Sequence, residues 1–469
     1  MKSKKSAYIA AVGVLVMIAT AIVASPRNDL IKKAALDRQN RSAAESGRTG
    51  ALSIQGRLVK LARTSDSQTP AAPTDSFCRS TLGFVCYSPF EIRRAYGLTD
   101  LIESGNTGAG QTIIVIDSFG SPTIAADLHT FDVGYGLPDP PSFQVLSPLG
   151  TVPFNPSDPD QITWAGEATA DVEWAHAMAP GANIVLMTSP VDETQGVTGL
   201  PEFLKLEQFA LKHHLGNIIS QSWGTPENNL FDSTAGVQVL TDFEKFYAHA
   251  AEENVTVLAG TGDNGSSGFE MDGVTVYPMR VVNFPASSPR VTAVGGTSLY
   301  ASTRGEHLTE TVWNSLFGEG GGGVSQYFAE PLYQTNSLPR VDQTLLKGFR
   351  GLPDVSINAD CNTAILIYES YIGAPGFYTF CGTSEGPPQW AGIVAVANQF
   401  AGRPLGFLNP RLYQLGHNGR LFSSMHDIIV SDNSVGFAVP GYFATPGWDP
   451  ASGWGTPRAG KLIHALAEE

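Results

Sequence analysis

A turn followed by a buried helix is predicted by the stretch Gly382-Thr383-Ser384-Glu385-Gly386-Pro387-Pro388-Gln389-Trp390-Ala391, which opens an apolar run to Gln399. Glycine permits a sharp turn, and proline suits the first helical turn because no amide hydrogen is needed there. Ser384 would project from this turn, where the helix dipole and free amides favour a developing anion. The stretch predicts a serine nucleophile and hence a hydrolase. A simple helix N-cap is the alternative.

A serine nucleophile needs a base, usually a histidine held by a carboxylate. None of the nine histidines lies in a glycine-flanked setting at a helix start. Residues 166–182 instead combine apolar side chains at helical spacing with Glu167 and Asp171, four residues apart. This spacing puts both carboxyls on one face of a helix, where two like charges tend to share a proton. The pair is a candidate acid–base system. An acidic first turn facing solvent is the alternative.

A third acid lies in a glycine-rich loop. The segment 255–266 begins as a β-branched apolar strand and continues as Gly260-Thr261-Gly262-Asp263-Asn264-Gly265. Loops after the strands of an open parallel sheet are the usual place for functional residues. Asp263 is therefore a candidate donor to an oxyanion, a role that requires a protonated carboxyl and so an acidic medium. A turn aspartate that only bonds to its own backbone is the alternative.

Together these segments resemble the sedolisins, which are serine-carboxyl peptidases with a subtilisin-like fold and a Ser-Glu-Asp triad. The resemblance implies that Ser384 is the nucleophile, Glu167 the general base, Asp171 the acid that orients it, and Asp263 the oxyanion-hole acid. It also implies protein or peptide substrates and an endopeptidase, although tripeptidyl-peptidase activity stays open. The resemblance covers about residues 88–460 and includes residues 88–97, 111–117, 217–224, 284–299, 320–325 and 353–356.

The C-terminal segments 426–429 and 445–455 suggest a cation site. They combine two carboxylates with several loop carbonyls, an all-oxygen set that suits calcium rather than zinc. In sedolisins this pattern is a calcium site. The resemblance implies side-chain ligands and backbone carbonyl ligands at these positions: Asp427, Ile428, Thr445, Gly447 and Asp449. An acidic surface loop is the alternative for either aspartate alone.

Composition describes a globular protein that is rich in loops. The 469 residues include 50 glycines and 31 prolines, and 42% are hydrophobic. A net charge of −15 argues against binding to nucleic acid, which attracts basic proteins. The expected protein is a monomer.

The N-terminus carries three lysines before an uncharged apolar run over about residues 7–24. Residues 1–25 are therefore expected to be a signal peptide or, if uncleaved, a membrane anchor, so the protein is expected to be secreted. Residues 26–87 are expected to be a short leader or linker, and residues 88–469 the peptidase domain. Sedolisin precursors usually carry a large folded prodomain, so this short leader leaves the activation route open.

Export also favours disulfide bonds between cysteines. Four cysteines allow three pairings. Proximity in the sequence favours Cys78 with Cys86. A bond between Cys361 and Cys381 would tether the region before Ser384.

Strand and helix patterns alternate along the chain. Strands are predicted near residues 111–117, 183–188, 217–222, 254–259 and 290–294, and helices near 165–179, 201–214, 237–252 and 387–400. This order predicts an α/β fold, a doubly wound and mainly parallel sheet flanked by helices, with the active site at the carboxyl ends of the strands. Asp117 ends the first strand, where subtilisins place an acid, but the helical spacing favours Asp171 as the triad partner.

Two other classes of protein use part of this set. A glycoside hydrolase also needs two carboxylates, but one helical turn is close for inverting geometry and Ser384 would have no role. A non-catalytic, calcium-stabilised surface protein on a peptidase fold would have no need of the serine and its three acids together. Their joint presence favours an enzyme.

Overall fold

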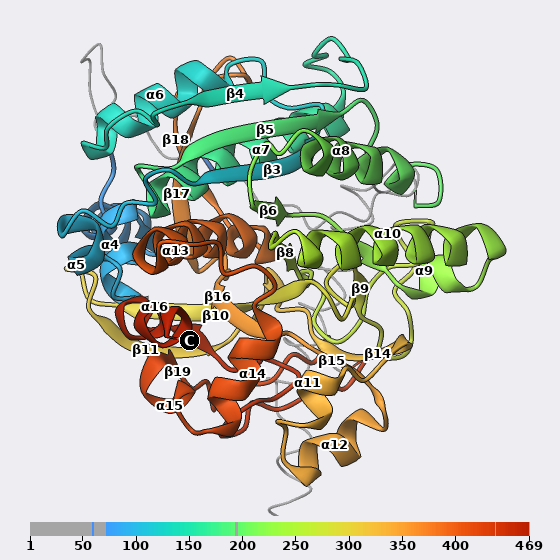
Figure 1. The fold of residues 1–469 in the computed structure, drawn as a ribbon. Coiled ribbons are helices and arrows are strands. Elements are labelled where there is room, and N and C mark those ends of the chain that lie inside the picture. Colours follow the sequence, from blue (N-terminus) through green and yellow to red (C-terminus); the bar gives the residue numbers. More distant parts are fainter. Residues whose placement is uncertain (1–58, 61–71, 193–195, 437, 469) are drawn as a thin grey trace, which may run out of the picture. The chain divides into compact units, whose positions relative to one another are not determined.

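Apolar, β-branched segments form a mainly parallel sheet (Figure 1). Its strand order is β11-β10-β8-β6-β3-β5-β4, and β16 also pairs with β10. Every pair is parallel except β10 with β11. The strands are β3 (Thr112–Ser118), β4 (Phe143–Leu146), β5 (Asn183–Ser189), β6 (Ile218–Gln221), β8 (Thr256–Gly260), β10 (Thr292–Ala301), β11 (His307–Val312) and β16 (Val355–Asn358).

This computed structural model describes residues 59–60, 72–192, 196–436 and 438–468, which all belong to the unit formed by residues 50–469. The doubly wound fold class and all five predicted strands are confirmed, and β10 extends seven residues beyond its predicted end at residue 294, to Ala301. None of the helices in the described ranges is long and apolar enough to cross a membrane. The expected signal or anchor at residues 1–25 lies outside them.

Side chains alternate between the two faces of the sheet, as the two-residue period of a strand requires. On β3, Ile113 and Val115 enter one hydrophobic cluster, and Ile114 and Ile116 enter the other. Helices cover both faces, so the central strands β3, β5, β6 and β8 are buried along almost their whole length. This double burial explains why the strands appear in the sequence as continuous apolar runs.

Two pairs of helices cover the sheet. The first cluster contains α7 (Pro159–Met178) and α13 (Gly386–Ala401), and the second contains α8 (Leu200–Lys212) and α10 (Thr234–Glu252). In Figure 1, β6 and β8 lie between α13 and α10. The four predicted helices are confirmed, although α7 begins six residues earlier than predicted because Asp158 caps its start by accepting a hydrogen bond from the Asp160 amide.

A second sheet has the order β1-β18-β17-β2, formed by β1 (Val59–Lys60), β18 (Gly376–Phe380), β17 (Thr363–Glu369) and β2 (Val85–Tyr87). The remaining elements are α3 (Asp75–Phe77), η1 (Cys78–Leu82), α4 (Pro89–Ala95), α5 (Thr99–Glu103), α6 (Ile124–Tyr135), β7 (Thr225–Pro226), α9 (Asn228–Phe231), β9 (Asn283–Phe284), β12 (Asn314–Ser315), β13 (Gly318–Glu319), β14 (Gly323–Ala329), α11 (Leu332–Thr335), α12 (Arg340–Leu346), β15 (Phe349–Leu352), η3 (Thr383–Glu385), α14 (Asn409–His417), α15 (Leu421–Ser424), β19 (Met425–His426), β20 (Thr456–Pro457) and α16 (Ala459–Ala467).

Two disulfides link the four cysteines, Cys78 with Cys86 and Cys361 with Cys381. Both predicted pairings are confirmed. Cys78 and Cys86 are fully buried, and β2 pairs in parallel with β17. The predicted domain boundary at residue 88 therefore falls inside a packed part of the chain, because residues between Asp75 and Tyr87 already form helix and strand.

Candidate active site

Ser384 lies in a tight 3-10 turn, η3, directly before α13. The turn begins at Gly382, whose φ of +126° is a backbone conformation that other residues rarely adopt. A Cβ atom at Gly382 would also lie only 2.7 Å from Oδ2 of Asp263. Glycine is therefore required at this position for two reasons. It adopts the positive φ angle, and it leaves room for the carboxyl group of Asp263. Ser384 itself is fully buried.

Asp263 is bonded to the same turn. It lies in the loop after β8, and its Oδ1 accepts hydrogen bonds from the backbone N of Thr383 at 2.7 Å and from the Thr383 hydroxyl at 2.9 Å. Thr383 Oγ1 in turn accepts a hydrogen bond from the Gly262 amide at 2.9 Å. These three bonds fix the carboxyl of Asp263 beside the residue that precedes Ser384.

The two acids of α7 belong to a buried cluster of acidic side chains, which lies where the parallel strands end. Glu167 and Asp171 are almost completely buried, and α7 contacts the turn that carries Ser384. Burial raises the pKa of Asp171 well above its usual value, and the charges of Asp117 and Glu167 raise it further. The Ser222 hydroxyl acts in the opposite direction and lowers this pKa. The structure thus brings the two helix acids next to a third carboxyl.

That third carboxyl is Asp117, the next-to-last residue of β3. It is fully buried, and burial raises its pKa to about 8. The helical spacing favoured Asp171 over Asp117 as the triad partner, whereas the structure places both acids in one cluster. The charge of Asp117 is close enough to raise the pKa of Asp171.

Ser222 was not identified from the sequence as a site residue. It follows β6 directly, and its hydroxyl donates a hydrogen bond to the Ser384 carbonyl oxygen at 3.2 Å. The segment 217–224 is part of the resemblance to the sedolisins, but a serine at a strand end has no pattern that distinguishes it from other turn residues. Only the approach of the end of β6 to the turn that carries Ser384 reveals its position.

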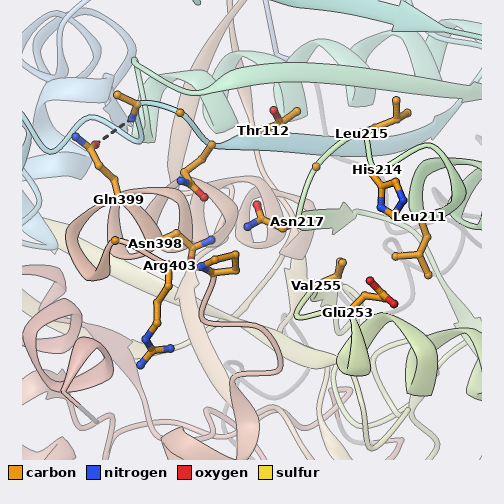
Figure 2. A pocket seen from close by; sticks show the side chains of 16 residues that line it. Thr112, Leu211, His214, Leu215, Asn217, Glu253, Val255, Asn398, Gln399 and Arg403 are labelled. Carbon is orange, nitrogen blue, oxygen red and sulfur yellow. Dashed lines mark hydrogen bonds between the residues drawn. The ribbon is translucent and has the colours of Figure 1, made fainter.

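A cavity of about 620 Å³ lies at the amino ends of the strands, whereas the acids and Ser384 lie at their carboxyl ends. Figure 2 shows Thr112 and Asn217 near the amino ends of β3 and β6, with Asn398 and Arg403 at the end of α13. Ser384 lies at the other end of α13, and none of the predicted site residues lines this cavity. The cavity is therefore separate from the candidate active site.

The predicted calcium ligands meet at one turn. Oδ1 and Oδ2 of Asp427 accept hydrogen bonds from the Gly447 amide at 3.1 Å, and Asp449 Oδ2 accepts one from the Thr445 amide at 2.8 Å. Asp449 is buried, and burial raises its pKa to about 7, although amides from Thr445, Ala451 and Ser452 lower it. Within the described ranges neither aspartate forms a salt bridge.

The other predicted calcium ligands are three backbone carbonyl oxygens. Those of Ile428, Thr445 and Gly447 accept no backbone hydrogen bond from the described residues. In the described part of the chain no three His, Cys, Asp or Glu side chains form a group that could hold a metal. A site of two carboxylates and three carbonyls does not need such a group. The donor set therefore fits a hard cation.

The fold and the site define a subtilisin-like α/β protein whose site combines a buried serine at a helix start with carboxyl groups. The chain is 36% identical over 387 residues to kumamolisin from Bacillus sp. (strain MN-32), across 81% of this chain and 63% of kumamolisin. It is 33% identical over 317 residues to tripeptidyl-peptidase 1 from Rattus norvegicus, across 64% of this chain and 51% of that protein. No protein-family model matches the chain.

The structure is similar to that of Pseudomonas sedolisin, a serine-carboxyl proteinase in complex with two molecules of pseudo-iodotyrostatin. The TM-score is 0.67 at 28% identity, across 82% of this chain and 98% of the other. The chain belongs to the sedolisin family. It spans less than two thirds of the length of kumamolisin and about half of the length of tripeptidyl-peptidase 1.

Proposed function

We propose that this chain is a serine-carboxyl peptidase that hydrolyses peptide bonds in acid. The observation that carries the proposal is the bonding of Asp263 to Thr383, which places an acid beside the buried Ser384. Ser384 would be the nucleophile, Glu167 its general base and Asp171 the acid that orients Glu167. Protein and peptide chains are the proposed substrates, cleaved in the interior of the chain.

In the acylation step Glu167 accepts the hydroxyl proton of Ser384 while Oγ bonds to the carbonyl carbon of the substrate. The carbonyl oxygen gains negative charge and accepts a hydrogen bond from the protonated carboxyl of Asp263. Glu167 then gives the proton to the departing amine as the C–N bond breaks. Water hydrolyses the acyl-enzyme by the same route, with Glu167 returning the proton to Ser384.

This mechanism needs an acidic medium. Asp263 donates only when it is protonated, while Glu167 must still accept a proton. Burial also holds the protons of Asp117 and Asp171 to higher pH than usual. We expect activity to fall as the pH rises towards neutrality.

A calcium ion is proposed at the C-terminal site, held by Asp427 and Asp449 and by the carbonyls of Ile428, Thr445 and Gly447. Such an ion would join two segments of the chain and stabilise the native state by mass action. Secretion through residues 1–25 and a short leader before the peptidase domain are also proposed, on the sequence pattern alone. Association with a membrane is proposed only if the first segment stays uncleaved.

The test is digestion of a denatured protein by the purified enzyme at several pH values, with sequencing of the products. Internal cleavage in acid that disappears in Ser384→Ala would support the proposal, and we expect a loss of roughly three orders of magnitude or more. Products that are all tripeptides would correct the mode of cleavage. Activity of Ser384→Ala near that of the unmodified enzyme would refute the assignment of the nucleophile.

A further inference from the structure

The turn that carries Ser384, residues 381–385, is called the nucleophile turn below. A short segment of the chain contacts this turn at three residues. This segment, residues 358–361, begins with the last residue of β16 and is called the brace below. The backbone N of Gly382 donates a hydrogen bond to the carbonyl oxygen of Ala359 at 2.8 Å. Asn358 Nδ2 donates to Oε2 of Glu385 at 3.1 Å. The disulfide between Cys361 and Cys381 joins the brace to the residue three positions before Ser384.

The brace is itself anchored to the sheet. Ala359 donates its amide hydrogen to the carbonyl oxygen of Thr297 on β10 at 2.8 Å. Asp360 is almost fully buried, and its two carboxyl oxygens accept hydrogen bonds from Ser298 at 2.8 Å and Ser315 at 2.9 Å. The brace therefore fixes the nucleophile turn relative to the central sheet.

Asp263 holds the opposite side of the turn through Thr383. The two bonds to Asp263 are hydrogen bonds to a loop, whereas the disulfide is a covalent link to Cys361, which lies between β16 and β17. Small displacements of a reacting atom change a rate strongly, because the attack geometry is narrow. A covalent link three residues from Ser384 is placed to prevent such a displacement.

We propose that the Cys361–Cys381 disulfide positions Ser384 for attack, so that its loss lowers turnover in addition to lowering stability. This inference rests on the proposed function, because it takes Ser384 as the nucleophile. Neither cysteine touches the substrate in this role, and both act through the turn.

The other disulfide provides a matched control. Cys78 and Cys86 are fully buried in the N-terminal part of the unit and are separated by eight residues. Within the described residues their side chains form no hydrogen bond with the nucleophile turn. Cys361 and Cys381 are separated by 20 residues, so their bond closes a longer loop and its loss is expected to lower the melting temperature more. Stability must therefore be measured separately from turnover.

The experiment compares Cys361→Ser/Cys381→Ser with Cys78→Ser/Cys86→Ser and the unmodified enzyme, in acid and at a temperature well below every melting transition. The first variant should lose about tenfold or more in kcat, with KM changed less than twofold, and should acylate more slowly in single-turnover experiments. The control variant should keep its kcat. An unchanged kcat in the first variant would show that the bond serves stability alone.

A second measurement covers the case in which the first variant does not fold. The folded Cys78→Ser/Cys86→Ser enzyme is treated with a water-soluble phosphine, which reduces the remaining disulfide, and kcat is followed against the thiols formed. A fall in kcat that follows thiol formation while circular dichroism stays constant supports the proposal, and full activity after complete reduction overturns it. If Ser384→Ala stays active instead, the proposed function fails and not only this inference.

Discussion

Burial controls the protonation of the carboxyls around Ser384. Asp117 and Asp171 are fully buried with Glu167 near them, so each ionised form lacks water and faces like charge. A carboxyl that stays protonated to high pH orients a neighbour by hydrogen bonding without opposing its charge. Ser384 is fully buried as well, so in the proposed mechanism an oxyanion beside it would be shielded from water and would form a stronger hydrogen bond with Asp263.

At this scale we predict the effect of removing the base. Glu167→Gln should lower kcat by about two to four orders of magnitude, because an amide does not accept the hydroxyl proton of Ser384. Glu173→Gln is the control, since Glu173 is also buried on α7 but its Oε2 accepts a hydrogen bond from the Tyr368 amide, which an amide oxygen also accepts. Equal losses in the two variants would indicate damage to α7 rather than to the base.

At the scale of elements, the approach of α13 to α7 brings Ser384 and the acids of α7 together. A Cβ atom at Gly392 would lie 2.3 Å from the Cβ of Met178, well inside contact distance. Glycine at this position therefore allows the two helices to pack closely. One helix carries Ser384 at its start and the other carries Glu167 and Asp171.

Gly392→Ala should therefore lower both stability and kcat. The expected loss of stability is about 1–3 kcal/mol, typical of an overpacked core, because Met178 lies on a helix and has little freedom to move. Gly376→Ala is the control, since the nearest atom to its added Cβ would be 4.0 Å away. Urea unfolding and kcat measured on both variants test this, and a Gly392→Ala enzyme as stable as the control would contradict it.

The turn at residues 445–447 is hydrogen-bonded to the carboxylates of Asp427 and Asp449. Asp449→Ala should lower the melting temperature in calcium and make melting insensitive to a chelator, because one carboxylate and its bonds to the turn are lost together. The exposed Asp272 is the control, and Asp272→Ala should keep the response to chelator. An unmodified protein that melts identically with and without chelator, and contains no calcium, would remove the assignment.

At the scale of the whole molecule, buried carboxyls make the fold itself sensitive to pH. Burial raises the pKa of Glu369 from 4.5 to about 7, with Tyr371 acting against the shift and Asp127 adding to it. The native state keeps this proton after the unfolded chain has lost it. The stability that Glu369 contributes is therefore complete below about pH 4.5 and is lost as the pH rises to 7, by about 1.4 kcal/mol per pH unit.

We therefore expect the melting temperature to fall between pH 4.5 and 7. Glu227 adds to this fall, because burial raises its pKa to about 7 as well. Glu369→Gln should make the fall less steep, because an amide does not ionise, whereas Glu103→Gln at an exposed position should not change it. Calorimetry over this range tests the prediction, and a melting temperature that rises with pH would contradict it.

Local patterns were enough to predict the sheet, its flanking helices, both disulfides and the family. Strands such as β3 are apolar on both faces, the Gly382 turn needs glycine, and the four-residue spacing of Glu167 and Asp171 follows from helix geometry. These signals lie within one segment each, so they are visible without tertiary contacts. The catalytic roles of Ser384, Glu167, Asp171 and Asp263 and the calcium ligands stay predictions.

Only the tertiary structure decided which distant residues join the site. Ser222 meets the Ser384 carbonyl across 162 residues of sequence, and Asp117 joins the acids of α7 only because β3 and α7 pack together. The brace at residues 358–361 likewise lies behind Ser384 because β16 pairs with β10. Such contacts depend on the packing of whole elements, which no periodicity within one segment records.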